Sequence, residues 1–421
     1  MKKIVSILFF ATILSYAQDS DNDWKFSGQI QIRGEYDGRD FSGESPPVEF
    51  VSLRTRVGIE KTFMGKVNFF AQIQDSRVFG EEGGTLAAID NIDLHQGYVI
   101  LKRLFDWGID IQAGRFEVVY GTERFFGAVG WHYVGRSWDG LKIKYDDVFK
   151  LDIFGLTQIE SASYIGNATP GVYPSPHKST YSSRVFGLWS TIGTAGINCV
   201  DLFGYFESDN RRNEIGEVNL KRFTTGLNLV KSYKIINTIA EAAYQFGEKE
   251  ALDISSYLIS LQVNFSKDWW KIGAGTDLIS GTDPKKSGKV NAFDPAFGTN
   301  HKFYGYMDYF INIPSNVNQL GLNDFYGNIS IKPSGSKFSL SVDFHHFTSN
   351  KPTNISPTAE PLYIDILGQE IDLTLKYNFV EGTIISAGGS IFFPGELMEL
   401  LLFYPRDDVA FWSYVMVTAN L

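Results

Sequence analysis

The chain has 421 residues, of which 48 are acidic and 38 are basic, and its formal charge is −10. It therefore lacks the basic surface that bulk nucleic-acid binding requires. Its single cysteine, Cys199, excludes an internal disulfide and a cysteine-rich metal site. Aromatic residues make up 15% of the chain, yet the mean hydropathy is −0.11, so the large apolar groups must be distributed in a fine pattern.

The N-terminus has the features of an export signal. Lys2 and Lys3 form a short basic start, residues 4–14 are apolar, and Ser15-Tyr16-Ala17 places small residues at the two positions that a signal peptidase reads. The apolar run is too short to span a bilayer as a helix. We therefore predict a removable signal peptide at residues 1–17 and one mature domain at residues 18–421, whose formal charge falls from −10 to −12.

Beyond this signal, the chain alternates between apolar and polar residues in one segment after another. In the first segment Phe26, Ile30 and Ile32 share one face, whereas Gln29 and Gln31 share the other. Side chains alternate across a strand with period 2, so each segment predicts a strand with one apolar and one polar face. The eighteen predicted segments are residues 25–36, 50–61, 65–75, 93–104, 108–115, 138–146, 149–157, 183–193, 196–207, 220–230, 235–246, 255–265, 270–279, 323–332, 337–347, 369–379, 383–392 and 409–421.

The connections between these segments alternate between short turns and long polar loops. Short turns are predicted near residues 63–65, 105–106, 146–147, 193–194, 232–233, 266–268, 333–335 and 381–382. Long loops are predicted near residues 37–49, 76–92, 116–137, 158–182, 208–219, 280–322 and 348–368. Transmembrane β-barrels show this asymmetry, with tight periplasmic turns and long outer loops.

Aromatic residues gather beside the short turns, as the interfacial girdle of a membrane barrel requires. They are Phe63, Phe105, Trp107, Phe149, Tyr233, Trp269 and Trp270. The alternation also continues to the last residue, Leu421, which suits a final strand that closes against the first. We predict an all-β fold, a transmembrane antiparallel barrel of about 18 strands, and barrels of that size leave an aqueous lumen.

Four stretches of the chain resemble the bacterial alginate-export outer-membrane family. They read DLHQGY at residues 93–98, QAGRFEVVYGTERFFGAVGWHYVGRSWDG at 112–140, FDPAFGTNHKFYGYMDYF at 293–310 and LGQEIDLTLKYNF at 367–379. The resemblance implies a monomeric barrel in the lipid of the cell outer membrane that passes an anionic polysaccharide such as a polyuronate. The broader expectation is a channel for an anionic saccharide or a small anionic solute.

The resemblance also implies a basic constriction inside the lumen. The candidates on predicted lumen faces are Arg33, Arg54, Arg56, Lys142 and Lys144, and those in the family-like stretch are Arg115, Arg124 and Arg136. Arginine suits carboxylate recognition because its planar fork donates two parallel hydrogen bonds. The alternative is that these are ordinary charges on a wet face, balanced by acids such as Glu35, Asp277 and Asp372.

Two further interpretations concern the loops. Arg136 and Asp139 are expected to pair with each other or with Glu123, and either pairing would pin a folded-in loop that could equally shape the constriction. Tyr304 and Tyr306, in the long 280–322 loop, are expected either to stack on sugar rings or to pack the loop down.

The chain shows no arrangement typical of a catalyst. A nucleophile elbow, a phosphate loop and a zinc-protease helix are all missing from the sequence. The six histidines have no metal-ligand spacing, and the Asp19, Asp21 and Asp23 series departs from a calcium loop at its sixth and twelfth positions, Trp24 and Ile30. We therefore expect no enzyme activity, metal or cofactor. The alternatives are a barrel enzyme at the cell surface and an adhesion barrel that binds through its long loops.

Overall fold

The computed structural model describes residues 24–41, 45–81, 91–160, 182–210, 212–213, 216–285, 288–354, 362–402 and 409–421. The predicted signal peptide, residues 1–17, lies outside these residues. Within the described part of the chain, no helix is both long and apolar enough to cross a membrane.

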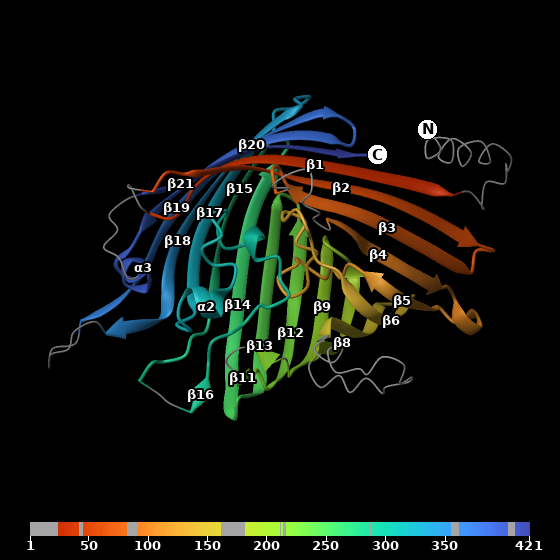
Figure 1. Cartoon of the computed structure of the whole chain (residues 1–421), viewed down its shortest axis with the longest axis horizontal. Coiled ribbons are helices and arrows are strands. Elements are labelled where there is room, and N and C mark those ends of the chain that lie inside the picture. The colour runs from red at the N-terminus through yellow and green to blue at the C-terminus, as the bar shows by residue number, and fades with distance from the viewer. Residues whose placement is uncertain are drawn as a thin grey trace.

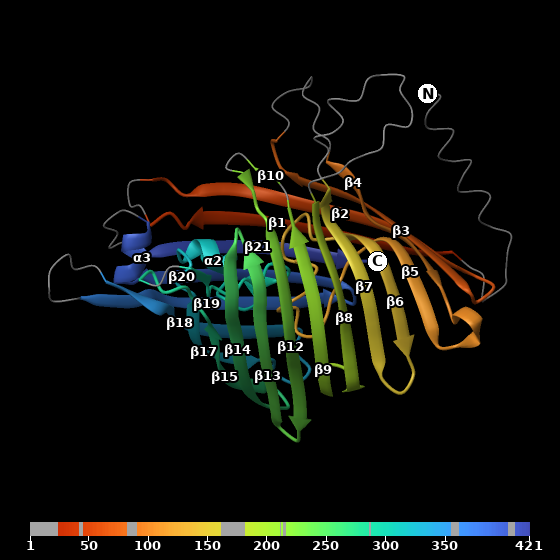
Figure 2. The ribbon, with the colours of Figure 1, turned by 90° about the horizontal axis from the view of Figure 1, so that it is seen from below.

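The structure is a closed antiparallel barrel of eighteen long strands, and each of them coincides with one predicted segment (Figures 1 and 2). The strands are β1 (Lys25–Gly38), β2 (Val48–Phe63), β3 (Val67–Val78), β4 (Ile92–Leu101), β5 (Ile109–Phe116), β6 (Trp138–Asp146), β7 (Lys150–Glu160), β8 (Ser182–Thr194), β9 (Asn198–Asp209), β12 (Leu220–Tyr233), β13 (Ile236–Lys249), β14 (Leu252–Lys267), β15 (Trp270–Ile279), β17 (Leu322–Ile331), β18 (Phe338–Asn354), β19 (Tyr363–Val380), β20 (Thr383–Pro394) and β21 (Ala410–Asn420). The prediction of the fold class is confirmed.

The ring closes between its first and last strands. Strand β1 pairs with β2 on one side and with β21 on the other, in a register that runs from Gln29 opposite Asn420 to Gly38 opposite Phe411. Two backbone hydrogen bonds between Gly28 and Leu421, of 3.1 and 2.8 Å, extend this pairing to the last residue. The barrel therefore has no open edge along β1 or β21.

The two faces of each strand differ in the way that the alternation predicts. In β14, Ile259 and Leu261 are 48% and 45% exposed on the outside, whereas Ser256 and Ser260 are 0% and 3% exposed on the inside. A water-soluble sandwich would bury the aliphatic face and expose the serines. Large apolar side chains cover the outside of the other strands in the same way, as a lipid-facing wall requires.

The short turns lie at one end of the barrel, called here the short-turn end, and the long connections lie at the opposite, long-loop end. One connection departs from the alternation, because β13 and β14 meet at the long-loop end through only Glu250 and Ala251. Both residues have positive φ, 50° and 67°, as a two-residue hairpin turn requires. The sequence contains no Asn-Gly or Asp-Gly here that would have marked this turn.

Short elements are confined to the connections. They are the pair β10 (Arg212–Asn213) and β11 (Gly216–Glu217), strand β16 (Lys289–Val290), the 3-10 turns η2 (Leu104–Asp106) and η4 (Asn300–Lys302), and helices α2 (Ile313–Asn316) and α3 (Glu396–Leu401). The aromatic girdle is present at the short-turn end, where Phe105 and Trp107 are 76% and 67% exposed.

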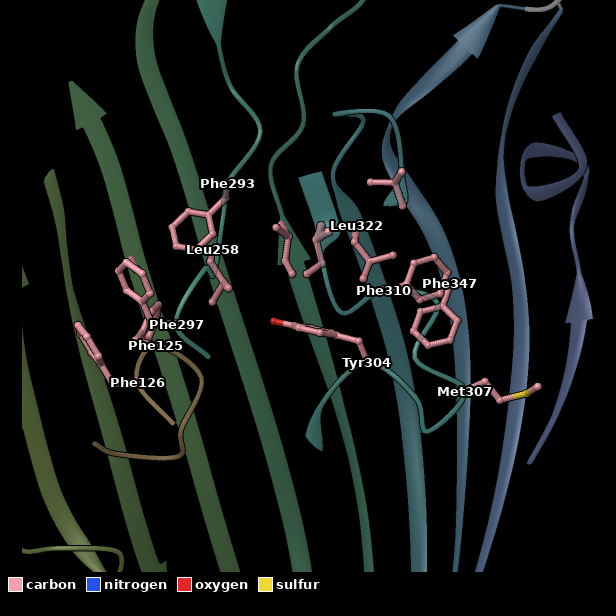
Figure 3. Packing of buried hydrophobic residues seen from close by; sticks show 14 of the residues in the cluster. Phe125, Phe126, Leu258, Phe293, Phe297, Tyr304, Met307, Phe310, Leu322 and Phe347 are labelled. Atoms are coloured by element: carbon pink, nitrogen blue, oxygen red, sulfur yellow. The ribbon is translucent and has the colours of Figure 1, made fainter. Parts of the chain in front are cut away.

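The lumen is not an empty water-filled tube, because two connections fold into it. These are loop A, residues 117–137, and loop B, residues 280–321. Figure 3 shows Phe125 and Phe126 of loop A beside Phe293 and Phe297 of loop B, and Phe310 of loop B beside Phe347 of β18. The hydrophobic core of this protein therefore lies inside the barrel, where the two loops pack against each other and against the wall. We call loops A and B together the plug.

We predict that Phe310→Ala loosens the plug and leaves the barrel intact. Phe310 is fully buried and lies 4.6 Å from the Phe347 ring, and removing such a side chain costs about 3–5 kcal/mol. Limited proteolysis should then cleave within residues 280–321, while the β-sheet circular dichroism persists to the same temperature. The matched control is Ile311→Ala, since the neighbouring Ile311 is 49% exposed. Equal protease resistance of both variants would contradict the packing role of Phe310.

Candidate functional site

The arginines of β1 and β2 hold loop A against the wall. The side chains at positions 33, 54 and 56 face inward because they share the strand face of the buried polar residues. Each donates to a backbone carbonyl oxygen of loop A. Arg33 Nη1 donates to the carbonyl oxygen of Trp131 at 2.6 Å. Arg54 Nη1 donates to the carbonyl oxygens of Gly130 at 3.1 Å and His132 at 2.9 Å. Arg56 Nη2 donates to the carbonyl oxygen of Val134 at 3.4 Å.

Two neutral donors on β3 extend this row. Gln74 Nε2 donates to the Val134 carbonyl at 2.9 Å, and Ser76 Oγ donates to the Tyr133 carbonyl at 2.9 Å. Every carbonyl from residue 130 to residue 134 therefore accepts a hydrogen bond from the wall, and Arg54 serves two of them, those of Gly130 and His132. Along this stretch the backbone of loop A is tied to the wall.

The three arginines differ in how their charge is balanced. Arg33 pairs with Glu35 at 2.7 Å, and Arg56 pairs with Glu117 at 3.2 Å. Arg54 is 4% exposed and has no carboxylate within ion-pair distance among the described residues. Of the three arginines, Arg54 is therefore the one whose charge is not balanced by a neighbouring carboxylate.

Glu117, the first residue of loop A, links Arg56 of β2 to His95 of β4. His95 Nε2 lies 2.7 Å from Glu117 Oε1, the same oxygen that contacts Arg56. Burial opposes ionisation of this carboxyl, but the hydrogen bond with His95 and the charge of Arg56 outweigh it and hold the pKa of Glu117 below its usual range. Glu117 is therefore ionised at neutral pH, and among the three arginines of β1 and β2 only Arg54 is left without a carboxylate partner.

Arg124 crosses the lumen and anchors loop A to the opposite wall. Its Nε donates to Glu241 Oε2 and its Nη1 to Asp277 Oδ2, both at 2.8 Å, while Nη2 donates to Ser260 Oγ at 3.1 Å. The guanidinium also lies 4.0 Å from the centroid of the Phe303 ring. Because Arg124 is 2% exposed and bound on every side, it serves as a structural anchor, and the prediction that it faces a solute is wrong.

Arg136 joins the two loops of the plug. Its Nη1 donates to the carbonyl oxygens of Phe297 and Gly298, the latter at 3.3 Å. Burial lowers the pKa of the Arg136 guanidinium to about 10, and no carboxylate among the described residues lies within ion-pair distance of it. The expected pair between Arg136 and Asp139 is absent, because Arg136 turns toward loop B.

Asp139 instead pairs with Arg115 outside the lumen. In β5 and β6 the buried residues Gln112, Phe116 and Lys142 face inward, so the odd-numbered residues face outward. Arg115 Nη1 lies 3.0 Å from Asp139 Oδ2 on that outer face. The prediction that Arg115 and Asp139 line the constriction is wrong, because the strand parity points both side chains away from it.

Lys142 and Lys144 both face inward from β6. Lys142 is 6% exposed, lies 3.3 Å from Asp152 Oδ2 and sits 4.8 Å from the centroid of the Tyr120 ring. Lys144 is only partly buried and has no ion pair with a described residue. Lys142 is therefore neutralised by its neighbours, whereas Lys144 still presents its charge to the lumen.

The two tyrosines expected to stack on sugar rings have different environments. Tyr304 is 1% exposed, and its hydroxyl accepts a hydrogen bond from Arg124 Nη1 at 2.9 Å, so it packs the loop down and is not open to a solute. Tyr306 stacks on His301 with the ring centroids 5.2 Å apart and lines a cavity. Only Tyr306 keeps the position in which it could meet a solute.

The plug leaves two main cavities, one toward each end of the barrel. The outer cavity, at the long-loop end, has a volume of about 400 Å³ and is lined by Glu207, Asp209, Arg222, Lys249 and Asp294, among others. The inner cavity, at the short-turn end, has a volume of about 460 Å³ and is lined by Trp131, His301, Lys302, Tyr306 and Lys376, among others. Residues 297–302 of loop B contribute to the walls of both cavities.

Several residues of the inner cavity were not predicted from the sequence. Trp131, His301 and Lys302 lie in the family-like stretches, and Lys376 lies in the stretch at residues 367–379. Their proximity could not be foreseen, because they come from two loops and a strand far apart in the chain. Among the described residues, no group of three histidine, cysteine or acidic side chains is arranged to hold a metal ion.

Comparisons with known proteins agree with this architecture. The family model described as alginate export matches residues 23–399. A search of curated protein sequences finds no match.

Solved structures from Pseudomonas aeruginosa share the fold at low sequence identity. OccK11 (OpdR) is 10% identical with a TM-score of 0.57, covering 96% of each chain. OccK8 (OprE) is 11% identical with a TM-score of 0.58, covering 95% of this chain and 98% of that one. OpdK, in a structure with vanillate, is 9% identical with a TM-score of 0.57, covering 94% and 98%. At these identities the likeness concerns the fold alone.

We predict that Arg124→Ala releases loop A from the acidic wall. The substitution leaves Glu241 and Asp277 buried without their cation, which costs about 3–5 kcal/mol. Single-channel recordings should then show a larger or noisier conductance than the unaltered protein. The matched control is Arg115→Ala, which breaks a more exposed pair worth about 1 kcal/mol or less and should leave the conductance unchanged. An unchanged conductance in Arg124→Ala would contradict the anchoring role.

Proposed function

This chain belongs to the alginate-export family, and we propose that it is an outer-membrane channel for an anionic saccharide or a small anionic solute. On this proposal the short-turn end faces the periplasm and the long-loop end faces the exterior. The solute passes by way of the two cavities that the plug leaves inside the barrel. The protein acts without a cofactor and performs no chemistry on its solute.

The observation that carries the proposal is the unbalanced charge of Arg54 on a wall that faces the lumen. Arg33 and Arg56 flank it, and each of them is paired with one carboxylate. The acidic residues Glu241, Asp277 and Asp324 lie on the opposite wall, where Arg124 and His345 bind them. The charge of Arg54 is therefore the one on these two walls without a counter-charge, although the mature chain as a whole is acidic. Since Arg54 is only 4% exposed, it acts on a solute through its electric field and not by direct contact. Charged groups at a constriction set the selectivity of channels generally.

We predict that Arg54→Gln reduces the preference of the channel for anions. One unit charge at 4 Å contributes about 1 kcal/mol in water, which corresponds to about a fivefold change in the partitioning of a monovalent ion. The measurement is the reversal potential of the protein in a planar bilayer under a KCl gradient. In Arg54→Gln the reversal potential should move toward the equilibrium potential of potassium.

Two further variants separate charge from structure. Arg54→Lys keeps the charge and loses the fork that binds Gly130 and His132, so it should retain most of the anion preference. Arg115→Gln removes a cation from the outer face and should change nothing. Anion preference that survives Arg54→Ala, Arg56→Ala and Arg136→Ala together would overturn the assignment, and a protein without any conductance would favour a surface enzyme or an adhesion barrel.

A further inference from the structure

Two carboxylic acids lie side by side on the inner face of β19, beneath loop B. Glu370 and Asp372 are both 0% exposed, and their alternate positions on one strand point them to the same face. Among the described residues, neither has a cation within ion-pair distance. An isolated carboxylate is costly to bury, so buried charges are normally paired. The protonation of these two acids is therefore set by each other and by their neighbours.

Glu370 holds loop B through the backbone of the loop. Its Oε1 accepts a hydrogen bond from the Met307 amide at 2.8 Å. Gly305 lies directly on the same carboxyl group, because a Cβ at this position would come within 2.5 Å of Glu370 Oε2. The stretch of loop B from Tyr304 to Phe310, called here the strap, is thereby laid on Glu370 (Figure 3).

The hydrogen bonds of the pair require a proton. Asp372 Oδ1 accepts a hydrogen bond from the Ser390 hydroxyl, and the Tyr306 amide of the strap also donates to the pair. The carboxyl groups of Glu370 and Asp372 are hydrogen-bonded to each other as well. An ionised carboxylate has no hydrogen to donate, so this bond forms only when one of the two acids is protonated. One shared proton also removes one of the two buried charges.

The neighbouring strand makes a second negative charge on the pair unfavourable. Across β18, Asp343 lies opposite Asp372 and His345 lies opposite Glu370. His345 Nδ1 lies 2.8 Å from Asp324 Oδ2, so this imidazole already serves another carboxylate. Full ionisation of the pair would therefore gather three carboxylates on one face of the wall, and like-charge repulsion opposes this.

The other elements around the pair contribute groups that are neutral, balanced or exposed. Strand β20 presents Ser390 and Phe392, which do not titrate, and helix α3, which also contacts β19, keeps its acids Glu396 and Glu399 at least partly exposed. Tyrosines are uncharged at neutral pH. The titratable groups that face the pair or the strap from these elements, loop B and the β1–β2 connection are Tyr306, Tyr309, Tyr414, Arg39, Asp37, Asp40, His301 and Asp308.

Arg39 holds the other side of the strap with a balanced charge. Its Nη1 donates to the Met307 carbonyl oxygen at 3.3 Å and lies 3.7 Å from Asp308 Oδ2, while its Nη2 lies 2.6 Å from Asp37 Oδ2. Arginine and aspartate keep their charges from neutral to mildly alkaline pH. His301 Nδ1 lies 2.6 Å from Asp308 Oδ1, and this imidazole is the group of the anchor that titrates near neutral pH. The anchor on β19, by contrast, depends on a shared carboxyl proton.

We propose that Glu370 and Asp372 form a proton-operated latch that holds the strap of loop B and releases it as the pH rises. In the latched state the pair carries one proton and one negative charge. When the proton leaves to the solvent, two adjacent charges remain without a cation, and the strap must move away before water can reach them. This inference concerns the packing of the plug and stands independently of the channel function.

The direction of the pH dependence follows from where the proton binds. The latched pair binds a proton that the released, water-exposed carboxylates give up, so the latch is stable at low pH and is lost as the pH rises. A second proton at low pH removes the remaining charge, but Glu370 Oε1 still accepts the Met307 amide as a carbonyl oxygen. Acid therefore leaves the strap in place, and alkali releases it.

The test is limited proteolysis of the purified full chain in detergent micelles with chymotrypsin, which cuts after aromatic residues. The strap offers Tyr304, Tyr306, Tyr309 and Phe310. Each rate is divided by the rate at which the same protease cuts unfolded casein at that pH. Release of one proton raises cleavage by up to about tenfold per pH unit, so we expect the strap to be cut at least about fivefold faster at about pH 9 than at about pH 7.

Two variants replace the shared proton with an amide that does not titrate. In Glu370→Gln the side-chain carbonyl still accepts the Met307 amide, and the NH2 group donates to Asp372. Its strap should resist cleavage equally at both pH values. Asp372→Asn supplies the same donor from the other side, and it decides the question if Glu370→Gln does not form the barrel. The matched control is Glu248→Gln, since Glu248 is exposed on β13, and it should keep the pH dependence of the unaltered protein.

The latch is overturned if the strap of the unaltered protein is cut equally at both pH values. It is also overturned if the pH dependence persists in Glu370→Gln, because another group such as His301 would then carry it, or if Glu248→Gln loses it too. Bilayer recordings on the same preparation keep the channel function separate. A protein that conducts but shows no such pH dependence overturns the latch alone, and one that shows it but does not conduct overturns the channel function alone.

Discussion

Inside a membrane, every backbone N–H and C=O group must find a partner within the protein, because the hydrocarbon offers none. This barrel meets the requirement by pairing β1 with β21, so that the sheet has no edge. The other features of the wall follow from closure. Once the ring is closed, one face of each strand meets lipid and the other meets the lumen, and the period-2 alternation of the sequence is the consequence.

Closure of eighteen strands creates a lumen too wide for the wall side chains to fill. Loops A and B occupy it, and their backbone carbonyls need hydrogen-bond donors there. Arg33, Arg54 and Arg56 satisfy carbonyls of loop A, and Arg136 satisfies carbonyls of loop B. The same arginines therefore carry positive charge into the lumen and position the plug.

Strand parity explains which candidate site residues face the lumen. Arg33, Arg54 and Lys142 were placed on the lumen face by the alternation, and they lie there. Arg115 and Asp139 were chosen because they lie in a family-like stretch, although the parity of Gln112 and Phe116 already pointed them outward. Position on a face is a local property of the chain, so the sequence can reveal it. The partner of a side chain is not a local property.

By itself, the sequence determined the number of strands, the face that each residue takes and the end of the barrel at which the long connections lie. All of these follow from patterns within about ten residues, set by the geometry of one strand and one turn. Only the tertiary structure decided that loops A and B fold inward, that Arg124 bridges Glu241 and Asp277, and that Trp131, His301 and Lys376 border one cavity. These contacts join residues more than seventy positions apart, and they form only after the closed ring has brought its walls within reach of the loops.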